Sequence, residues 1–163
     1  MAYPQYCPRF LRAADGGPPL IRAYREADSQ SFVAGDLVYL NSGYAYVCAD
    51  DATKILGMAL EAASNVTTGH KMIDVMIMRP GDEWAIRTTS GTTLTKLTGA
   101  NVGIAYAAEY ISSGLWSVDS SQTGADAFQC VKLLYDEDES TVDSSYYAVF
   151  TIIPSVAQYS QGA

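Results

Sequence analysis

Basic residues, histidine and long apolar runs are all scarce in this 163-residue chain, and each scarcity excludes a class of protein. Ten basic residues against 18 acidic ones give a formal net charge of −8, which repels nucleic acid and anionic membranes. No apolar run approaches the roughly 20 residues that a membrane-spanning helix needs. The first residues contain no apolar signal-peptide core, so we expect synthesis in the cytoplasm, with neither nucleic acid nor a membrane as a partner.

Motifs for catalysis and for cofactor binding are also missing. None of the patterns GxSxG, HExxH, GxxxxGKS/T or GxGxxG occurs. The only histidine, His70, lies in the turn-like stretch TTGHK, which favours a solvated loop residue over a general base. Asp82, Glu83 and Asp119 offer an acid pair, but hairpin turns commonly carry such residues for reasons of turn geometry. We therefore predict no enzyme, no catalytic residue, no metal and no cofactor.

The cysteines and the longest acidic run are most simply structural. Cys7, Cys48 and Cys130 are odd in number and widely spaced, which argues against a zinc or redox motif. We predict free thiols, with Cys48 and Cys130 buried. The acidic stretch DEDES at residues 136–140 lacks the glycine and the spaced ligands of an EF-hand loop, so we expect a solvated loop there without calcium.

Residues 1–31 differ in composition from the rest of the chain. Four of the six prolines lie there, together with two glycines, which disfavours a helix or a central strand. We expect an extended N-terminal arm that orders against a partner, the alternative being an arm folded back over its own domain. Arginines and apolar side chains are interleaved in the arm, and the expected contact residues are Arg9, Phe10, Arg12, Leu20, Ile21, Arg22, Tyr24 and Arg25.

Short β-rich runs separated by turn residues begin at Phe32. DLVYL and YAYVCA flank the hairpin turn NSG, MIDVMIM alternates with a period of two, and RPGD makes a turn before EWAIR. NVGIAYAAEYI, GLWSVD, AFQCVKLLY and SYYAVFTIIP supply further strands. About eight such runs predict an all-β barrel or sandwich over residues 32–154, followed by a polar C-terminal tail at 155–163.

The stretch KILGMALEAA at residues 54–63 fits two kinds of element. As a helix it places Ile55 and Met58 on one apolar stripe, with Asp50 or Asp51 as the N-cap. Gly57 decides between the two, because a glycine inside a helix costs about 1 kcal/mol relative to alanine, whereas a strand glycine often marks a close approach. Since the neighbouring segments are strands, we predict a strand.

The order of these segments resembles that of phage head decoration proteins, also called capsid cement proteins. The resemblance rests on FVAGDLVYLNSGYAYVCADDATKILGMALEAA, VMIMRPGDEWAI, LTGANVGIAY, LWSVDSS and FQCVKLL, and covers about Phe32 to Leu134. It implies a small β-barrel, β-tulip-like, preceded by an extended arm. It also implies a non-enzymatic homotrimer, assembled in the host cytoplasm, that binds the major capsid protein on the outer surface of the mature virion and stabilises the head. The arm residues named above are then the capsid contacts.

Two other functions compete with this interpretation. The first is a glycan- or receptor-binding β module of a phage tail fibre or cell surface, with Trp84 and Trp116 as candidate sugar platforms. The second is a small hydrolase that uses the three carboxylates Asp82, Glu83 and Asp119, for which the turn contexts offer little support.

Overall fold

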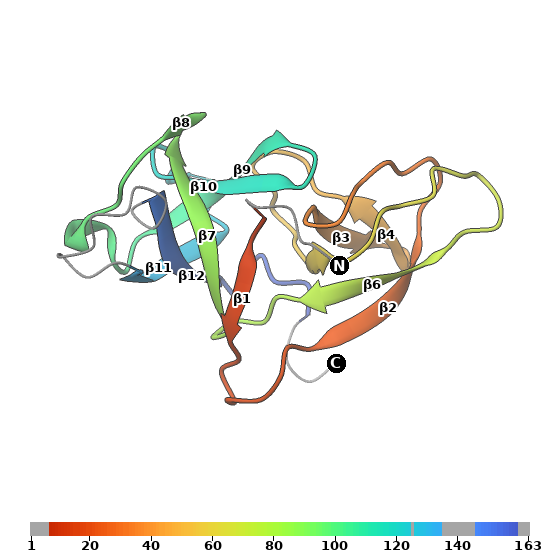
Figure 1. The fold of residues 1–163 in the computed structure, drawn as a ribbon, viewed down its shortest axis with the longest axis horizontal. Helices are drawn as coiled ribbons and strands as arrows, with labels where there is room; N and C mark the ends of the chain where they lie inside the picture. Colours follow the sequence, from red (N-terminus) through yellow and green to blue (C-terminus); the bar gives the residue numbers. More distant parts are fainter. Residues whose placement is uncertain (1–6, 125, 135–145, 160–163) are drawn as a thin grey trace.

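The computed structural model describes residues 7–124, 126–134 and 146–159, and these residues form almost only β-structure (Figure 1). The strands are β1 (Arg9–Arg12), β2 (Ile21–Glu26), β3 (Leu37–Asn41), β4 (Tyr44–Val47), β5 (Gly57–Ala59), β6 (Met72–Ile77), β7 (Glu83–Ser90), β8 (Thr93–Leu94), β9 (Ala105–Ser112), β10 (Leu115–Asp119), β11 (Phe128–Leu133) and β12 (Tyr147–Ile152). One 3-10 turn, η1 (Gly99–Asn101), completes the described elements. No helix among the described residues has the length and apolarity to cross a membrane. The predicted all-β class is confirmed.

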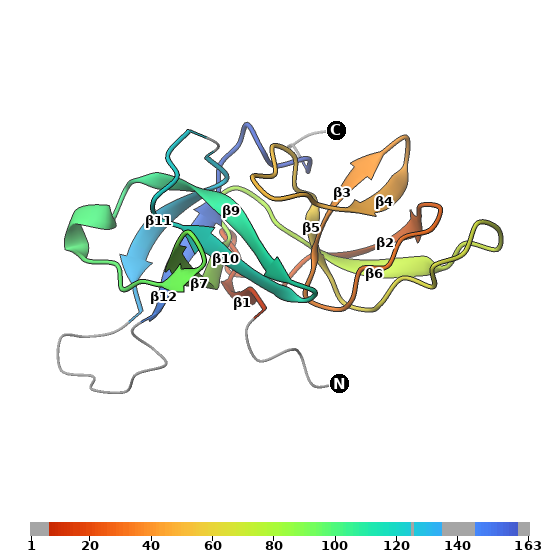
Figure 2. The same cartoon turned by 90° about the horizontal axis from the view of Figure 1, so that it is seen from above.

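The strands close into two small barrels that lie side by side along the long axis of the molecule (Figures 1 and 2). The first barrel has the strand order β2, β4, β3, β5, β6. The second barrel runs β7, β10, β9, β11, β12 and closes where β12 pairs back with β7. The expected single barrel or sandwich over residues 32–154 is therefore a pair of barrels, and the second begins at Glu83.

The prediction of an extended N-terminal arm is wrong for residues 7–31, the part of it that the structure describes. Strand β2 pairs along β6, from Ile21 opposite Met76 to Arg25 opposite Met72, and so completes the first barrel. Strand β1 pairs with β7 of the second barrel. Phe10, Leu20 and Tyr24 pack on the chain's own barrels, which removes much of their surface from water without any partner, whereas Leu11 and Ile21 stay exposed. Residues 1–6 lie outside the described residues.

Proline and glycine separate these two N-terminal strands instead of preventing them. Gly16 has a φ of 74° and donates its N–H to the Ala13 carbonyl at 3.0 Å, which makes a turn after β1. Pro18 and Pro19 follow in the connection, outside any strand, where a missing N–H removes no ladder hydrogen bond. The expected boundary at residue 31 is thus not a boundary of the fold.

The ambiguous stretch at residues 54–63 contains a strand, as predicted, although a short one. Only Gly57–Ala59 forms β5, which pairs with both β3 and β6. A Cβ atom on Gly57 would lie 2.1 Å from the Met76 carbonyl oxygen. The glycine is therefore required by the close approach of two backbones, which is the reason that favoured a strand.

One hydrophobic core cluster crosses from the second barrel into the first. It contains the buried rings of Trp84 and Trp116 together with Leu37, Met58 and Met76 from the first barrel. A separate cluster fills the inside of the first barrel. All three cysteines are buried free thiols, which confirms the prediction for Cys48 and Cys130. Because apolar packing is continuous across the junction, the barrels support each other.

A buried carboxylate also joins the two barrels. Asp36, in the loop before β3, is 1% exposed and accepts a hydrogen bond from the Val33 N–H at 2.9 Å. Its other oxygen accepts from the Gly114 N–H at 2.6 Å and from the Trp116 indole N–H at 3.0 Å, both in the β9–β10 hairpin of the second barrel. Such a charge is tolerated in the interior because several donors replace its lost water.

The expected C-terminal tail is wrong over residues 155–159. The Gln158 side chain accepts from the Leu40 N–H at 2.6 Å and donates to the Leu40 carbonyl at 2.9 Å, so it acts like a short added strand on β3. Ala157 forms a parallel bridge with Ile55, and Val156 is buried. Residues 160–163 lie outside the described residues.

Candidate functional site

The eight expected contact residues stay at the surface although their backbone belongs to the fold. They lie on β1, on β2 and immediately before β2. The side chains of Arg9, Arg12, Ile21, Arg22 and Arg25 are exposed, whereas those of Phe10, Leu20 and Tyr24 are half-buried. The structure therefore holds the predicted cationic and apolar residues on two fixed strands, one at each barrel, and we call the side chains of these eight residues together the β1–β2 face.

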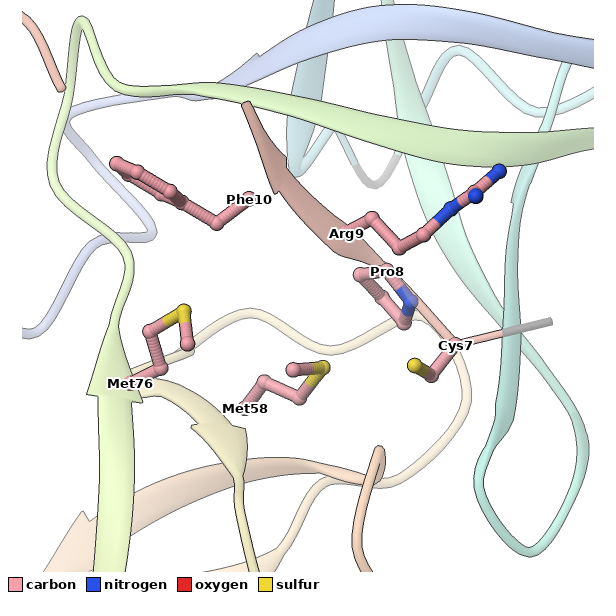
Figure 3. A pocket seen from close by; sticks show the side chains of 6 residues that line it. All are labelled: Cys7, Pro8, Arg9, Phe10, Met58 and Met76. Atoms are coloured by element: carbon pink, nitrogen blue, oxygen red, sulfur yellow. The ribbon is translucent and has the colours of Figure 1, made fainter. Parts of the chain in front are cut away.

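A cavity of about 290 Å³ lies beside β1, at the junction of the two barrels (Figure 3). Its lining comes from the N-terminal segment and, across the cavity, from β5 and β6 of the first barrel. The lining residues are Cys7, Pro8, Arg9, Phe10, Met58 and Met76. Apart from Arg9, these side chains are apolar, so the cavity suits an apolar group with a cation at its margin.

Sequence reasoning named only Arg9 and Phe10 of this lining. Cys7, Met58 and Met76 were missed because they belong to three segments far apart in the chain: pairing of β5 with β6 brings the two methionines together, and pairing of β1 with β7 fixes the segment that contains Cys7. The alternation in MIDVMIM carried a partial signal, since a period of two places Met72 and Met76 on one face of the strand.

Strand β1 has an unpaired edge next to the cavity. It is the last strand of its sheet and, among the described residues, pairs only with β7. No residue of β7 contributes to the cavity lining, so the cavity lies on the side of β1 that faces away from β7. The pairing with β7 shifts register at Leu11, whose side chain is exposed. An unpaired strand edge of this kind can pair with another extended segment.

Three side-chain contacts hold β1 on the second barrel. The Phe10 ring packs edge-on against Trp84, with ring centroids 5.6 Å apart and an interplanar angle of 81°. The Arg9 guanidinium lies 5.1 Å from the centroid of the Tyr147 ring. The Arg12 guanidinium donates to Glu83 at 2.9 Å. These contacts pre-set the orientation of the strand before any partner binds.

The charge at β1 is positive, in contrast to the chain as a whole. Arg12 and Lys132 share the one carboxylate of Glu83, at 2.9 and 3.4 Å. No ion pair is recorded for Arg9 within the described part of the chain. On a chain with a formal net charge of −8, this local excess of cations favours a partner that brings carboxylates.

The three carboxylates of the hydrolase scheme do not come together. Asp82 accepts from the Ala14 N–H and from Arg79, each at 3.0 Å, and Glu83 holds Arg12 and Lys132. Asp119 pairs with Thr89, toward the opposite end of β7 from Glu83. Burial raises the pKa of Asp119, but hydrogen bonds from Ser121 and Gly91 outweigh burial and lower that pKa. Each group thus has structural partners of its own.

The prediction that Trp84 and Trp116 act as sugar platforms is wrong. Trp84 and Trp116 are 0% exposed, so neither ring face is available to a ligand. The expectation of a solvated His70 is also wrong, since its side chain is only 15% exposed and its Nε2 lies 2.9 Å from an Asp28 oxygen. A cavity of about 250 Å³ adjoins His70 and is lined by Asp28, Tyr44 and Tyr46 as well.

A cluster of three carboxylates, which sequence reasoning did not single out, lies where β9 passes the loop after β4. Oxygens of Asp50, Asp51 and Glu109 lie within 4.8 Å of one another, close enough to hold one cation. Burial is the main cause that raises the pKa of Glu109 to about 7, and the charges of Asp50, Asp119 and Asp51 add to it.

The β1–β2 face with its cavity is the strongest candidate site, because it combines a free strand edge, an apolar recess and two cations, Arg12 and Lys132, that share a single carboxylate. No family model, curated protein or solved structure matches this chain.

Proposed function

We propose that this chain is a structural virion protein that binds the outer surface of the mature capsid and stabilises it, as a homotrimer at threefold positions. The observation that carries the proposal is the β1–β2 face, where Arg9 lies at the margin of an apolar cavity and further exposed arginines lie on β1 and β2 of an otherwise acidic chain. The order of segments that resembles decoration proteins supports the same role. The partner is the major capsid protein, and assembly takes place in the host cytoplasm, without a cofactor, a nucleic acid, a membrane or catalysis.

The contact surface proposed here is preformed. An arm that ordered only on binding would lose roughly 1–2 kcal/mol of backbone entropy per residue. Strands β1 and β2 are already paired in the free chain, so this loss is made on folding instead. A preformed face therefore retains more of its contact energy as affinity.

Stabilisation of the capsid follows from selective binding. A protein that binds only the mature lattice stabilises it by about 2.7 kcal/mol per site when its free concentration is 100 times Kd. A trimer adds avidity, because one released subunit is held near its site by the other two. Summed over the sites of a shell, these terms oppose the outward pressure of packaged DNA.

The test is co-sedimentation with expanded empty shells, assembled from the major capsid protein of the same virus. Arg9→Glu and Arg22→Glu each reverse an exposed charge on the β1–β2 face and should weaken binding about tenfold. Lys54→Glu makes the same charge change at an exposed position outside the face and should leave binding unchanged. The proposal fails if intact protein does not bind shells, or if all three variants bind alike. Sedimentation equilibrium tests the trimer.

Glycan binding is the second candidate function, and the cavity beside His70 is the observation that favours it. Tyr44 is 40% exposed and can stack on the apolar face of a sugar, while the exposed Asp28 carboxylate can accept from sugar hydroxyls. A glycan array probed with intact protein and with Tyr44→Ala tests this role. Binding that disappears in Tyr44→Ala, in a protein that ignores shells, would favour it.

A further inference from the structure

We infer that the free edge of β1 accepts an extended acidic segment of the capsid protein as an added strand, with one bulky apolar side chain of that segment seated in the cavity between the barrels. The inference rests on the proposed function for the source of the segment. The extended conformation, the apolar side chain and the acidic charge of the segment are inferred from three features of the β1–β2 face: the unpaired edge, the cavity beside it and the local charge.

The unpaired edge selects an extended partner. Each edge of a strand carries N–H and C=O groups that a second strand can satisfy at a spacing of about 4.8 Å. The other edge of β1 is used by β7, so one strand can be added, on the side of the cavity. Backbone pairing of this kind supplies affinity with little dependence on sequence, and pockets for alternate side chains supply specificity.

The cavity provides such a pocket. At about 290 Å³ it is near the lower bound of ligand sites, roughly 300 Å³, and so suits one bulky side chain better than a large ligand. Met58 and Met76 face β1 across it, as Figure 3 shows, and unbranched methionines adjust their shape to an incoming apolar group. The Phe10 ring, fixed against Trp84, forms a firm wall.

The charge around β1 selects an acidic segment and disfavours a second copy of this chain. Arg9 has no recorded ion pair in the described part of the chain, and Arg12 competes with Lys132 for Glu83. Pairing β1 with β1 of a second copy would bring like charges together, a common protection of edge strands against self-association. Carboxylates on the incoming strand would instead neutralise these arginines.

The first experiment measures fluorescence anisotropy of labelled, overlapping peptides that cover the capsid protein. Met76→Phe fills the cavity and should weaken the best-binding peptide about tenfold. Met72→Phe is the matched control, because Met72 is on the same face of β6, is 50% exposed and does not line the cavity. Two further versions of this peptide carry methyl groups on alternate backbone nitrogens, one version at the odd positions and the other at the even positions. Only one of the two versions should lose binding, because only one edge of the added strand is paired.

A second variant covers the case in which Met76→Phe disturbs folding, which thermal unfolding will reveal. Arg9→Gln changes only an exposed side chain and should weaken the acidic peptide several-fold while flattening its dependence on salt. Slower hydrogen exchange at the β1 amides that do not bond to β7 is expected on peptide binding.

The outcomes separate this inference from the proposed function. If intact protein binds shells and both Met76→Phe and Met72→Phe bind them equally well, the added strand is wrong, whereas the capsid role still holds. Failure of intact protein to bind shells would overturn the capsid role itself. If Met76→Phe abolishes self-association while no peptide binds, the occupant is a second copy and the inference is wrong.

Discussion

Replacing Asp36 by alanine should remove the buried hydrogen bonds that join the two barrels and so lower the free energy of unfolding. The substitution removes the acceptor for Gly114 N–H, Trp116 Nε1–H and Val33 N–H, and the first two of these hydrogen bonds are fully buried. Each buried donor left without a partner costs about 1–3 kcal/mol. The loss of the carboxylate's own burial penalty offsets part of this, so we expect the free energy of unfolding to fall by about 3–5 kcal/mol.

Such a loss is large beside the 5–15 kcal/mol of a typical domain and corresponds to a fall in Tm of about 10 °C. The assay is urea unfolding followed by circular dichroism and by tryptophan fluorescence, which reports directly on Trp116. Asp74→Ala, at an exposed position on β6, is the control and should change stability by less than about 0.5 kcal/mol. Asp36→Asn keeps one acceptor oxygen and should lie between the two. A loss below about 1 kcal/mol for Asp36→Ala would refute the role of this carboxylate as the joint between the barrels.

Three further predictions concern stability and reactivity. Gly57→Ala places a Cβ atom 2.1 Å from a backbone oxygen and should destabilise the first barrel by more than about 3 kcal/mol, whereas Gly99→Ala, with open space around it, should be nearly neutral in thermal unfolding. Burial raises the pKa of Glu109 from 4.5 to about 7, so its ionisation should lower stability as pH rises from about 4.5 through 7. Glu109→Gln should therefore be more stable than the parent at pH 8 by about 1 kcal/mol after solvent screening, and a pH-independent difference would contradict this. Burial raises the pKa of the Cys48 thiol well above its usual range and that of the Cys130 thiol to about 11. Neither thiol should therefore react with iodoacetamide at pH 8 until urea unfolds the chain. Rapid labelling of the folded protein would contradict this prediction.

Sequence reasoning named Arg9 and Phe10 among the residues that line the cavity of the candidate site. The interleaved arginines and apolar residues of the N-terminal segment predicted a contact surface, because too much apolar area lies there for an idle tail. The opposite wall, Met58 and Met76, was out of reach because no local pattern links β5 and β6 to β1. Trp84 and Trp116 were wrong as sugar platforms, since a large ring serves equally well in a core and only burial distinguishes the two uses.

The all-β class was determined by the sequence alone, because alternation with a period of two and turn residues such as NSG and RPGD are local properties of the chain. The role of Gly57 was also predictable from the sequence, since a glycine in a strand often marks a close approach of two backbones. Only the tertiary structure decided that the strands close into two barrels, that β2 completes the first barrel and β1 pairs with β7 of the second instead of forming an arm, and that a cavity remains at the junction. The physical reason is that pairings such as β2 with β6 and the bonds of Asp36 to the β9–β10 hairpin join residues far apart in the chain, so the free energy that selects them exists only in the folded state.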